Sequence, residues 1–119
     1  MTFFKFFKHN DGISAFAAIA VEPITGVRDP IEWGPKVKAR QMIYGDAVSN
    51  GIRDALDWHL REGGVATAFR ILEIEELLVD TKPDAVRCAA TMAAWKALGH
   101  DETAIAFEFD GAWNARRMK

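Results

Sequence analysis

The sequence lacks several features that would indicate a particular class of protein. Its 119 residues include one cysteine, Cys88, so no disulfide can form within the chain, which is typical of proteins in a reducing compartment. No apolar run approaches the roughly 20 residues that span a bilayer, and no stretch matches the nucleotide-binding loop G-x-x-x-x-G-K-[ST]. We therefore expect a cytoplasmic protein with no membrane association and no nucleotide-binding loop.

The sequence also lacks a strong excess of charge of one sign. The net charge is −2, whereas proteins that bind the phosphate backbone over a broad surface are usually strongly basic. Binding to RNA or the ribosome is therefore weakly supported. Half of the residues are hydrophobic and 27% are charged, as in ordinary globular proteins. The length predicts one domain, residues 1–112, followed by a basic, frayed C-terminal tail, residues 113–119.

One N-terminal pattern resembles a signal peptide. Lys5 and Lys8 precede the apolar run Ile13–Val21, but Asn10–Gly12 interrupts the segment where a signal peptide should be continuous. Asp-Gly between two apolar runs instead indicates a β-hairpin. We interpret this region as two strands of a cytoplasmic protein.

Alternating and helical hydrophobic periodicities divide the rest of the chain into strands and helices. The segment Val65–Asp80 is ambiguous, because Phe69 and Ile71 alternate with Arg70 while EIEELL could continue a helix; two preceding glycines favour a strand. Thr81 and Asp84 predict a capping box around Pro83. We expect strands at Phe3–Lys8, Ile13–Glu22, Ile31–Trp33, within Val65–Asp80 and at Thr103–Phe109, and helices at Gln41–Glu62 and Pro83–Leu98.

A glycine within the first predicted helix needs a reason, because glycine costs about 1 kcal/mol relative to alanine there. Gly51 lies on the apolar stripe of this helix, and the second helix is rich in alanine. Small residues allow close approach, so we expect two helices seated closely on a sheet. The order β-β-β-α-β-α-β predicts an α+β two-layer sandwich, with two helices on one face of a mostly antiparallel sheet.

Three collinear stretches resemble domain IV of translation elongation factor G. AAIAVEPI (Ala17–Ile24) resembles its strand ending in Val-Glu-Pro-Leu, YGDAVSNGIRDAL (Tyr44–Leu56) its first helix, and VDTKPDAVRCAATMAAWKAL (Val79–Leu98) the start and body of its second helix. The resemblance covers about Lys5 to Phe109. It implies a left-handed β-α-β crossover, which the handedness rule makes rare, and a link to translation.

The resemblance also identifies two tip loops, which reach the decoding centre in the translocase. Here the first tip is short and lacks arginine, and the second has acidic and leucine side chains where an aromatic-histidine-acid run would be expected. Such side chains are poor partners for phosphates and bases, so contact with the decoding centre is doubtful. The expected tip residues are His9, Asn10, Asp11 and Gly12 in the first loop and Glu75, Glu76 and Leu77 in the second.

The candidate chemical groups do not form a recognisable site. His59 and Glu62 are one helical turn apart, but a metal site needs a third ligand, which the sequence does not indicate. Cys88 lies in an alanine-rich helix and is interpreted as a buried, inert thiol. Glu73, Glu75 and Glu76 are interpreted as a solvated acidic edge. We predict no catalytic residues, no cofactor and no metal.

The strand FFKFFK has aromatic residues on both faces, Phe3 and Phe7 on one and Phe4 and Phe6 on the other. A single core layer buries only one of these faces. The other needs a second subunit, a target protein, or an intramolecular cover such as Trp113. We expect self-association of this strand as a closed homodimer, because Lys5 and Lys8 oppose open-ended edge pairing.

The sequence therefore predicts a non-catalytic binding or interaction module similar to elongation factor G domain IV. Two alternatives stay open: a small enzyme of a related left-handed α+β sandwich fold, and a homo-oligomeric structural domain without a ligand. The ligand and the pathway are not indicated by the residues.

Overall fold

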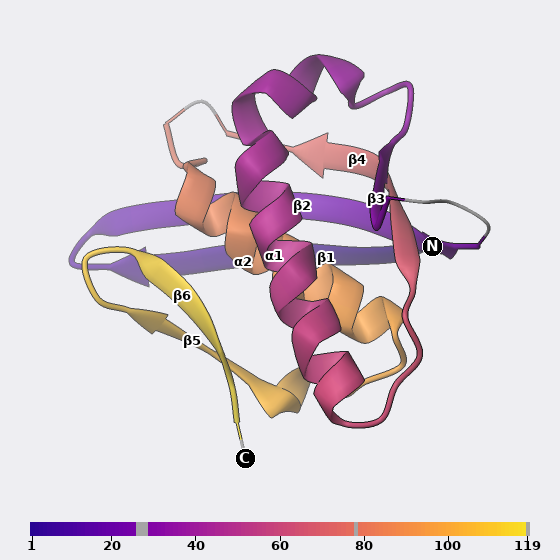
Figure 1. The fold of residues 1–119 in the computed structure, drawn as a ribbon. Coiled ribbons are helices and arrows are strands. Elements are labelled where there is room, and N and C mark those ends of the chain that lie inside the picture. The colour runs from indigo at the N-terminus through magenta and orange to yellow at the C-terminus, as the bar shows by residue number, and fades with distance from the viewer. Residues whose placement is uncertain (26–28, 78, 119) are drawn as a thin grey trace.

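The computed structural model describes residues 1–25, 29–77 and 79–118. Over these residues the chain forms six strands, two α-helices and two short 3-10 helices (Figure 1). Their bounds are β1 Thr2–Asn10, β2 Ile13–Ile24, β3 Ile31–Trp33, η1 Lys38–Arg40, α1 Gln41–Arg61, β4 Ala68–Glu75, α2 Pro83–Ala97, η2 Glu102–Ala104, β5 Ile105–Phe109 and β6 Trp113–Arg117. The predicted order is confirmed up to β5, and β6 is an additional strand.

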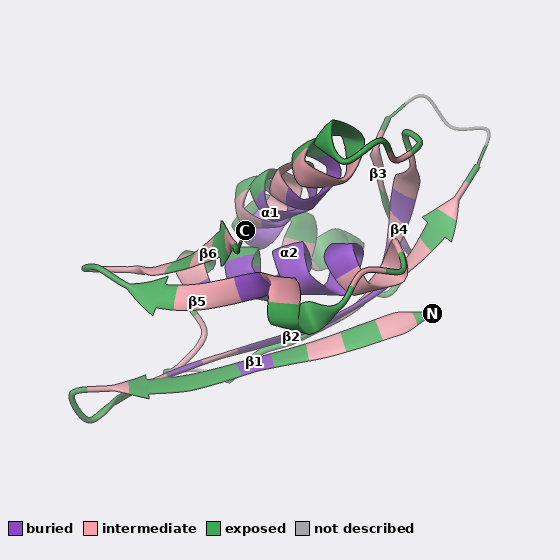
Figure 2. Ribbon diagram, turned by 90° about the horizontal axis from the view of Figure 1, so that it is seen from below, coloured by how far each residue is buried: buried purple, intermediate pink, exposed green. Residues whose placement is uncertain are grey.

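In the described part of the chain, four strands form one sheet in the order β1-β2-β4-β3. The β1–β2 and β2–β4 pairs are antiparallel, and only β3–β4 is parallel. Both helices lie on the same side of this sheet (Figure 2). The fold is therefore the predicted α+β arrangement, with two helices on one face of a mostly antiparallel sheet. None of the helices in the described ranges is long and apolar enough to cross a membrane.

The first two strands form the predicted hairpin. Asp11 and Gly12 have φ values of 51° and 78°, and Asn10 pairs with Ile13. Two successive positive φ values are those of a two-residue turn whose twist matches the flanking strands. The predicted end of the second strand at Pro23 is wrong: β2 continues to Ile24, with Pro23 opposite Phe69 of β4.

Helix α2 lies between the sheet and α1. It contacts β1 and β2, while α1 packs mainly on α2. A side chain at Gly51 of α1 would clash with the carbonyl oxygen of Arg87 in α2 and come within 3.0 Å of the Ala90 Cβ. The expectation that Gly51 allows close approach is confirmed, but its partner is α2 and not the sheet.

The predicted capping box at the start of α2 does not form. Lys82 is the N-cap residue, and no side chain caps the helix there. The Thr81 hydroxyl donates instead to the carbonyl oxygen of Phe16 in β2, at 2.7 Å. The Asp84 carboxylate accepts from the backbone N–H of Trp113, at 2.9 Å. Thr81 therefore binds a distant strand, whereas the Asp84 carboxylate binds Trp113 and also accepts from the N–H of Ala85 in the first turn of α2, at 2.8 Å.

The C-terminal segment is not the frayed tail that the sequence predicts. Residues 113–117 form β6, which pairs with β5 as a separate two-stranded antiparallel sheet. Ion pairs from Arg116 to Glu108 and from Arg117 to Glu62 also hold it. The sequence indicated exposure because of its charge, whereas only Asn114 and Arg116 face outward; Trp113, Ala115 and Arg117 share the half-buried face of the strand. Lys119 lies outside the described residues.

Candidate functional site

Strand β1 presents aromatic side chains on two faces, as predicted, and lies at the edge of the four-stranded sheet. Phe6 pairs with Ala17 of β2 and is 1% exposed, so it faces the helices. Phe3 and Phe7 face the opposite side and are 41% and 51% exposed. The two faces of β1 therefore have different surroundings.

The β5–β6 hairpin covers the inner face of β1. The ring centroid of Phe107 lies 6.0 Å from that of Phe4 and 4.9 Å from that of Phe6. Trp113 meets Phe6 edge to face at 5.6 Å. Phe4 and Phe6 were both expected to take part in self-association; that is wrong for these two residues, because the chain's own C-terminal hairpin covers them.

The outer face of the sheet has no helix on it (Figure 2). Its side chains lie in rows across the strands, since Phe3 pairs with Ala20 and Ala20 with Glu73, while Lys5 pairs with Ala18 and Ala18 with Glu75. In these two rows the face has Phe3 and Lys5 on β1, the fully buried Ala18 and Ala20 on β2, and Glu73 and Glu75 on β4. Elsewhere on the same face Phe16 lies opposite Phe7, and Arg70 of β4 pairs with Glu22. This arrangement of opposite charges on either side of an apolar centre suits an interaction with a second protein surface.

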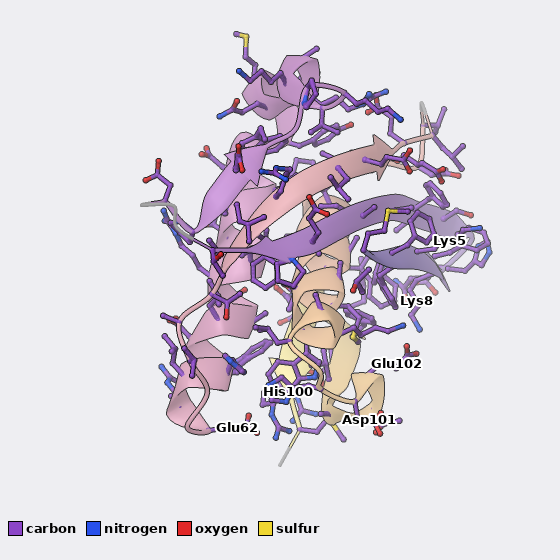
Figure 3. The ribbon with its side chains drawn as sticks, turned by 90° about the vertical axis from the view of Figure 1, so that its right-hand side faces the viewer. Lys5, Lys8, Glu62, His100, Asp101 and Glu102 are labelled. Atoms are coloured by element: carbon purple, nitrogen blue, oxygen red, sulfur yellow. The ribbon has the colours of Figure 1, made fainter. Side chains whose placement is uncertain are left out.

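A groove of about 450 Å³ lies between β1 and β5. Its walls are consecutive residues of the two strands, Phe4 to Lys8 and Ile105 to Phe107, together with Met92 and Glu102. Among the described residues, no backbone hydrogen bond joins β1 to β5. In Figure 3 Lys5, Lys8 and Glu102 lie along this side of the molecule.

The two predicted tip loops lie at the same end of the molecule (Figure 1). In the first loop, the Ser14 hydroxyl oxygen and His9 Nδ1 are hydrogen-bonded at 2.9 Å. Asn10 to Gly12 form the turn. The second loop lies alongside β2, because the N–H of Phe16 donates to the carbonyl oxygen of Asp80 at 3.0 Å. The segment that follows the second expected tip is therefore held against β2.

The second tip is stabilised by Glu76. Its carboxylate accepts hydrogen bonds from the Tyr44 hydroxyl of α1 and, at 3.3 Å, from Arg40. Burial, followed by the bond to Glu76, raises the pKa of Tyr44 to about 12. Glu75 and Leu77 are exposed. The acidic edge is thus partly committed to internal bonds, since Glu73 also lies 3.9 Å from Lys36.

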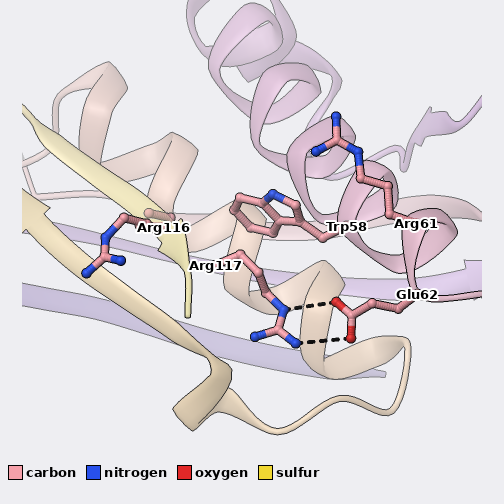
Figure 4. Close-up of a pocket in the computed structure, with 6 residues that line it drawn as sticks. Trp58, Arg61, Glu62, Arg116 and Arg117 are labelled. Atoms are coloured by element: carbon pink, nitrogen blue, oxygen red, sulfur yellow. Dashed lines mark hydrogen bonds and ion pairs between the residues drawn. The ribbon is translucent and has the colours of Figure 1, made fainter. Parts of the chain in front are cut away.

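A second cavity, of about 530 Å³, lies between the end of α1 and β6 (Figure 4). Trp58 forms one wall, and Arg61, Glu62, Arg116 and Arg117 surround it. The Arg117 guanidinium donates two hydrogen bonds to the Glu62 carboxylate, at 2.9 and 3.0 Å. This bidentate pair joins β6 to the end of α1. It also holds the pKa of Glu62 below its usual value.

Beside this cavity the structure brings together two histidines that are distant in sequence. His59 Nδ1 lies 2.7 Å from His100 Nε2, and the His100 ring stacks on Trp95 with centroids 3.9 Å apart. His100 is therefore a neighbour of the His59–Glu62 pair that sequence reasoning missed, because it follows the end of α2 with no periodic relation to α1. The described residues nevertheless contain no group of three or more side chains arranged to bind a metal.

Cys88 is buried in α2, as predicted. Burial, and then the negative charge of Asp84, raises the pKa of its thiol to about 12. The thiolate is the nucleophilic form of cysteine. At neutral pH this side chain therefore stays a neutral thiol enclosed by the core.

The chain was compared with protein-family models and with curated proteins, and neither comparison gave a match.

Proposed function

We propose that this chain is a non-catalytic interaction module, similar to domain IV of elongation factor G, that forms a homodimer through the outer face of its four-stranded sheet. The observation that carries the proposal is the exposure of Phe3 and Phe7, at 41% and 51%, on a sheet face that has no helix on it. Exposed apolar patches of this kind mark interaction surfaces in folded proteins.

The charges of this face are complementary under one kind of two-fold symmetry. A two-fold axis parallel to β2, midway between two stacked sheets, places β1 of each copy over β4 of the other. Lys5 then lies opposite Glu75 of the second copy, because both pair with Ala18 in the same row. An axis perpendicular to β2 would instead bring the two β1 strands and their lysines together, so we favour the parallel axis.

The expected dimer is weak. Strands spaced about 4.8 Å apart with a rise of about 3.3 Å per residue give this face roughly 14 by 30 Å. That is about 400 Å² in projection, below the roughly 800 Å² per partner of standard interfaces. We therefore expect reversible association with a dissociation constant on the order of 10 to 100 μM, which suits a regulated or concentration-dependent contact.

Sedimentation velocity from about 1 to 300 μM tests the dimer. The dissociation constant of the Phe3→Ser/Phe7→Ser dimer should be at least about ten-fold higher than that of the wild type. The matched control is Ile43→Ser on α1, which removes an apolar side chain that is 67% exposed but lies elsewhere. Lys5→Glu and Glu75→Lys should each weaken the dimer, and the double variant should restore it. A wild type that stays monomeric at 300 μM contradicts the proposal.

The resemblance to the translocase domain supports a link to translation, while the tip loops argue against its decoding-centre contact. The first tip contains no arginine, and Glu76 at the second is bonded to Tyr44 and Arg40. We expect the isolated protein not to co-sediment with small ribosomal subunits at physiological salt. Salt-dependent co-sedimentation that is lost on charge reversal of Lys8 and His9 would contradict this part of the proposal.

A further inference from the structure

We propose that the groove between β1 and β5 binds an extended acidic segment of a partner protein, which pairs with the free edge of β1. This inference goes beyond the dimer, which uses the outer face of the sheet and not its edge. Both strands that line the groove have unpaired edges in the described part of the chain, because β1 pairs only with β2 and β5 only with β6. Unpaired strand edges are templates for an added strand.

The groove has the dimensions of a short strand. It follows β1 from Phe4 to Lys8, and five residues at about 3.3 Å each span roughly 16 Å. Phe4 and Phe107 lie on its inner side, together with the Lys8 ammonium over the Phe107 ring. An extended segment would therefore gain backbone hydrogen bonds from β1 and turn every second side chain toward the inner side, where Lys8 lies, and the others toward the outer face with Phe3 and Phe7.

The charges of the groove favour an acidic segment. The Lys8 ammonium lies over the Phe107 ring, 5.9 Å from its centroid, and Lys8 forms no ion pair with any described residue. At the other end, Lys96 lies 5.7 Å from the Phe4 centroid and pairs with Glu102 at 3.0 Å. Two lysines from different elements thus border the groove, against one carboxylate that is already paired. A carboxylate on the incoming segment would complete the environment of Lys8.

A peptide fits these features better than a single-stranded nucleic acid. Stacking of bases requires open aromatic faces, whereas Phe4 and Phe6 are packed against Phe107 in this groove. The backbone groups of two strand edges, in contrast, suit a chain that offers alternating N–H and C=O groups. RNA is therefore an outcome that the experiment must exclude.

Fluorescence polarisation with a fluorescein-labelled peptide of sequence EVEVEVE tests the proposal. We expect EVEVEVE to bind the full-length protein saturably. EVEPEVE should bind at least about ten-fold more weakly than EVEVEVE, because proline removes a backbone donor from the strand. KVKVKVK should not bind. Lys8→Glu should weaken binding of EVEVEVE about ten-fold. Lys38→Glu, the same charge change on exposed η1, should leave binding unchanged.

Backbone amide chemical shifts locate the contact. Addition of EVEVEVE should shift the amides of residues 4–8 and 105–107, with smaller changes elsewhere. The proposal is overturned by absence of saturable binding, by equal binding to the Lys8→Glu variant, or by shifts confined to other residues. It is also overturned if oligouridylate competes with the peptide, or if the amides of residues 105–107, which lie outside the dimer face, shift when the protein alone is concentrated. The last result would assign the edge to a second copy.

Folding of each variant is checked by its circular dichroism spectrum and its sedimentation. Lys8→Glu leaves Phe3, Phe7, Lys5 and Glu75 in place, so dimerisation should be unchanged while peptide binding is weakened about ten-fold. Conversely, Phe3→Ser/Phe7→Ser should weaken the dimer at least about ten-fold and retain peptide binding. Failure of the groove proposal and failure of the dimer proposal are therefore distinguishable.

Discussion

The hydroxyl of Thr91 in α2 lies 3.1 Å from the carbonyl oxygen of Gly51 in α1 and 2.9 Å from that of Arg87, one turn earlier in its own helix. Thr91 is the buried polar side chain of the described core. Its position between two backbones depends on the missing side chain at Gly51, where an added Cβ would also lie 3.1 Å from the Thr91 nitrogen. The two helices therefore meet backbone to backbone at this point.

Substitution of Gly51 by alanine should destabilise the protein, although alanine is the better helix former. The new methyl group would clash with the Arg87 carbonyl, and overpacking of a core typically costs about 1–3 kcal/mol. Gly45→Ala in the same helix is the matched control: its Cβ would lie at 3.7 Å from Gln41 Cγ, an ordinary contact, so a gain of up to about 1 kcal/mol is expected. Urea denaturation of both variants measures the difference. A stabilised Gly51→Ala would show that the helices are not in close contact there.

The His59–His100 pair should make stability depend on pH. Burial, and then the positive charge that His59 can carry, lowers the pKa of His100; Arg117 acts in the same direction and Glu62 opposes it. In the unfolded chain histidine titrates near about 6.5. Because the folded pKa is the lower one, the contribution is complete above about pH 6.5 and is lost as the pH falls below that value and through the folded pKa.

Guanidinium denaturation at pH 7.5 and pH 5.5 tests this expectation, and the wild type should be less stable at the lower pH. His100→Gln should reduce the difference between the two values. His9→Gln, which changes an exposed histidine in the hairpin, should leave it as in the wild type. This account is excluded if the wild type is more stable at pH 5.5 than at pH 7.5 and His100→Gln removes that difference.

The β5–β6 hairpin should contribute to the stability of the whole domain. The Trp113 ring packs on Phe6 and Phe109, so Trp113→Ala should cost about 2–4 kcal/mol. Asn114→Ala, at the adjacent exposed position, should stay within about 0.5 kcal/mol of the wild type. Thermal unfolding of the two variants decides between a packed hairpin and a frayed tail, since a frayed tail would leave Trp113→Ala neutral.

Cys88 should be unreactive in the folded protein. Its thiol is buried, and its pKa of about 12 leaves almost no thiolate at neutral pH. Reaction of Cys88 with Ellman's reagent at pH 8 should therefore be slow in buffer. In about 6 M guanidinium, which unfolds the protein, the reaction should be complete within minutes. Equal rates in the two solvents would mean that α2 opens readily to solvent.

Local periodicity determined most of the secondary structure. Alternation in FFKFFK and the stripe through Val48, Ile52 and Ala55 reflect which side of each element is buried, and this depends on residues near in sequence. The Asp11-Gly12 turn was also predictable, because its backbone requires positive φ values. The α+β class followed from the order of these elements.

Other features required distant contacts that a periodic pattern does not encode. Gly51 could be placed on an apolar stripe, but only the packing of α1 on α2 identified Arg87 as its neighbour. The charge of WNARR suggested exposure, yet its pairing with β5 and the Arg117–Glu62 bond make it a strand. The contact of His59 with His100 depends on where α1 and α2 end in space.

The sequence by itself determined that β1 has two aromatic faces, because side chains alternate along any strand. Only the tertiary structure decided their surroundings: the C-terminal hairpin covers Phe4 and Phe6, while Phe3 and Phe7 stay on the exposed face. The physical reason is that alternation is a local property of the backbone, whereas burial depends on which remote segment packs against each face.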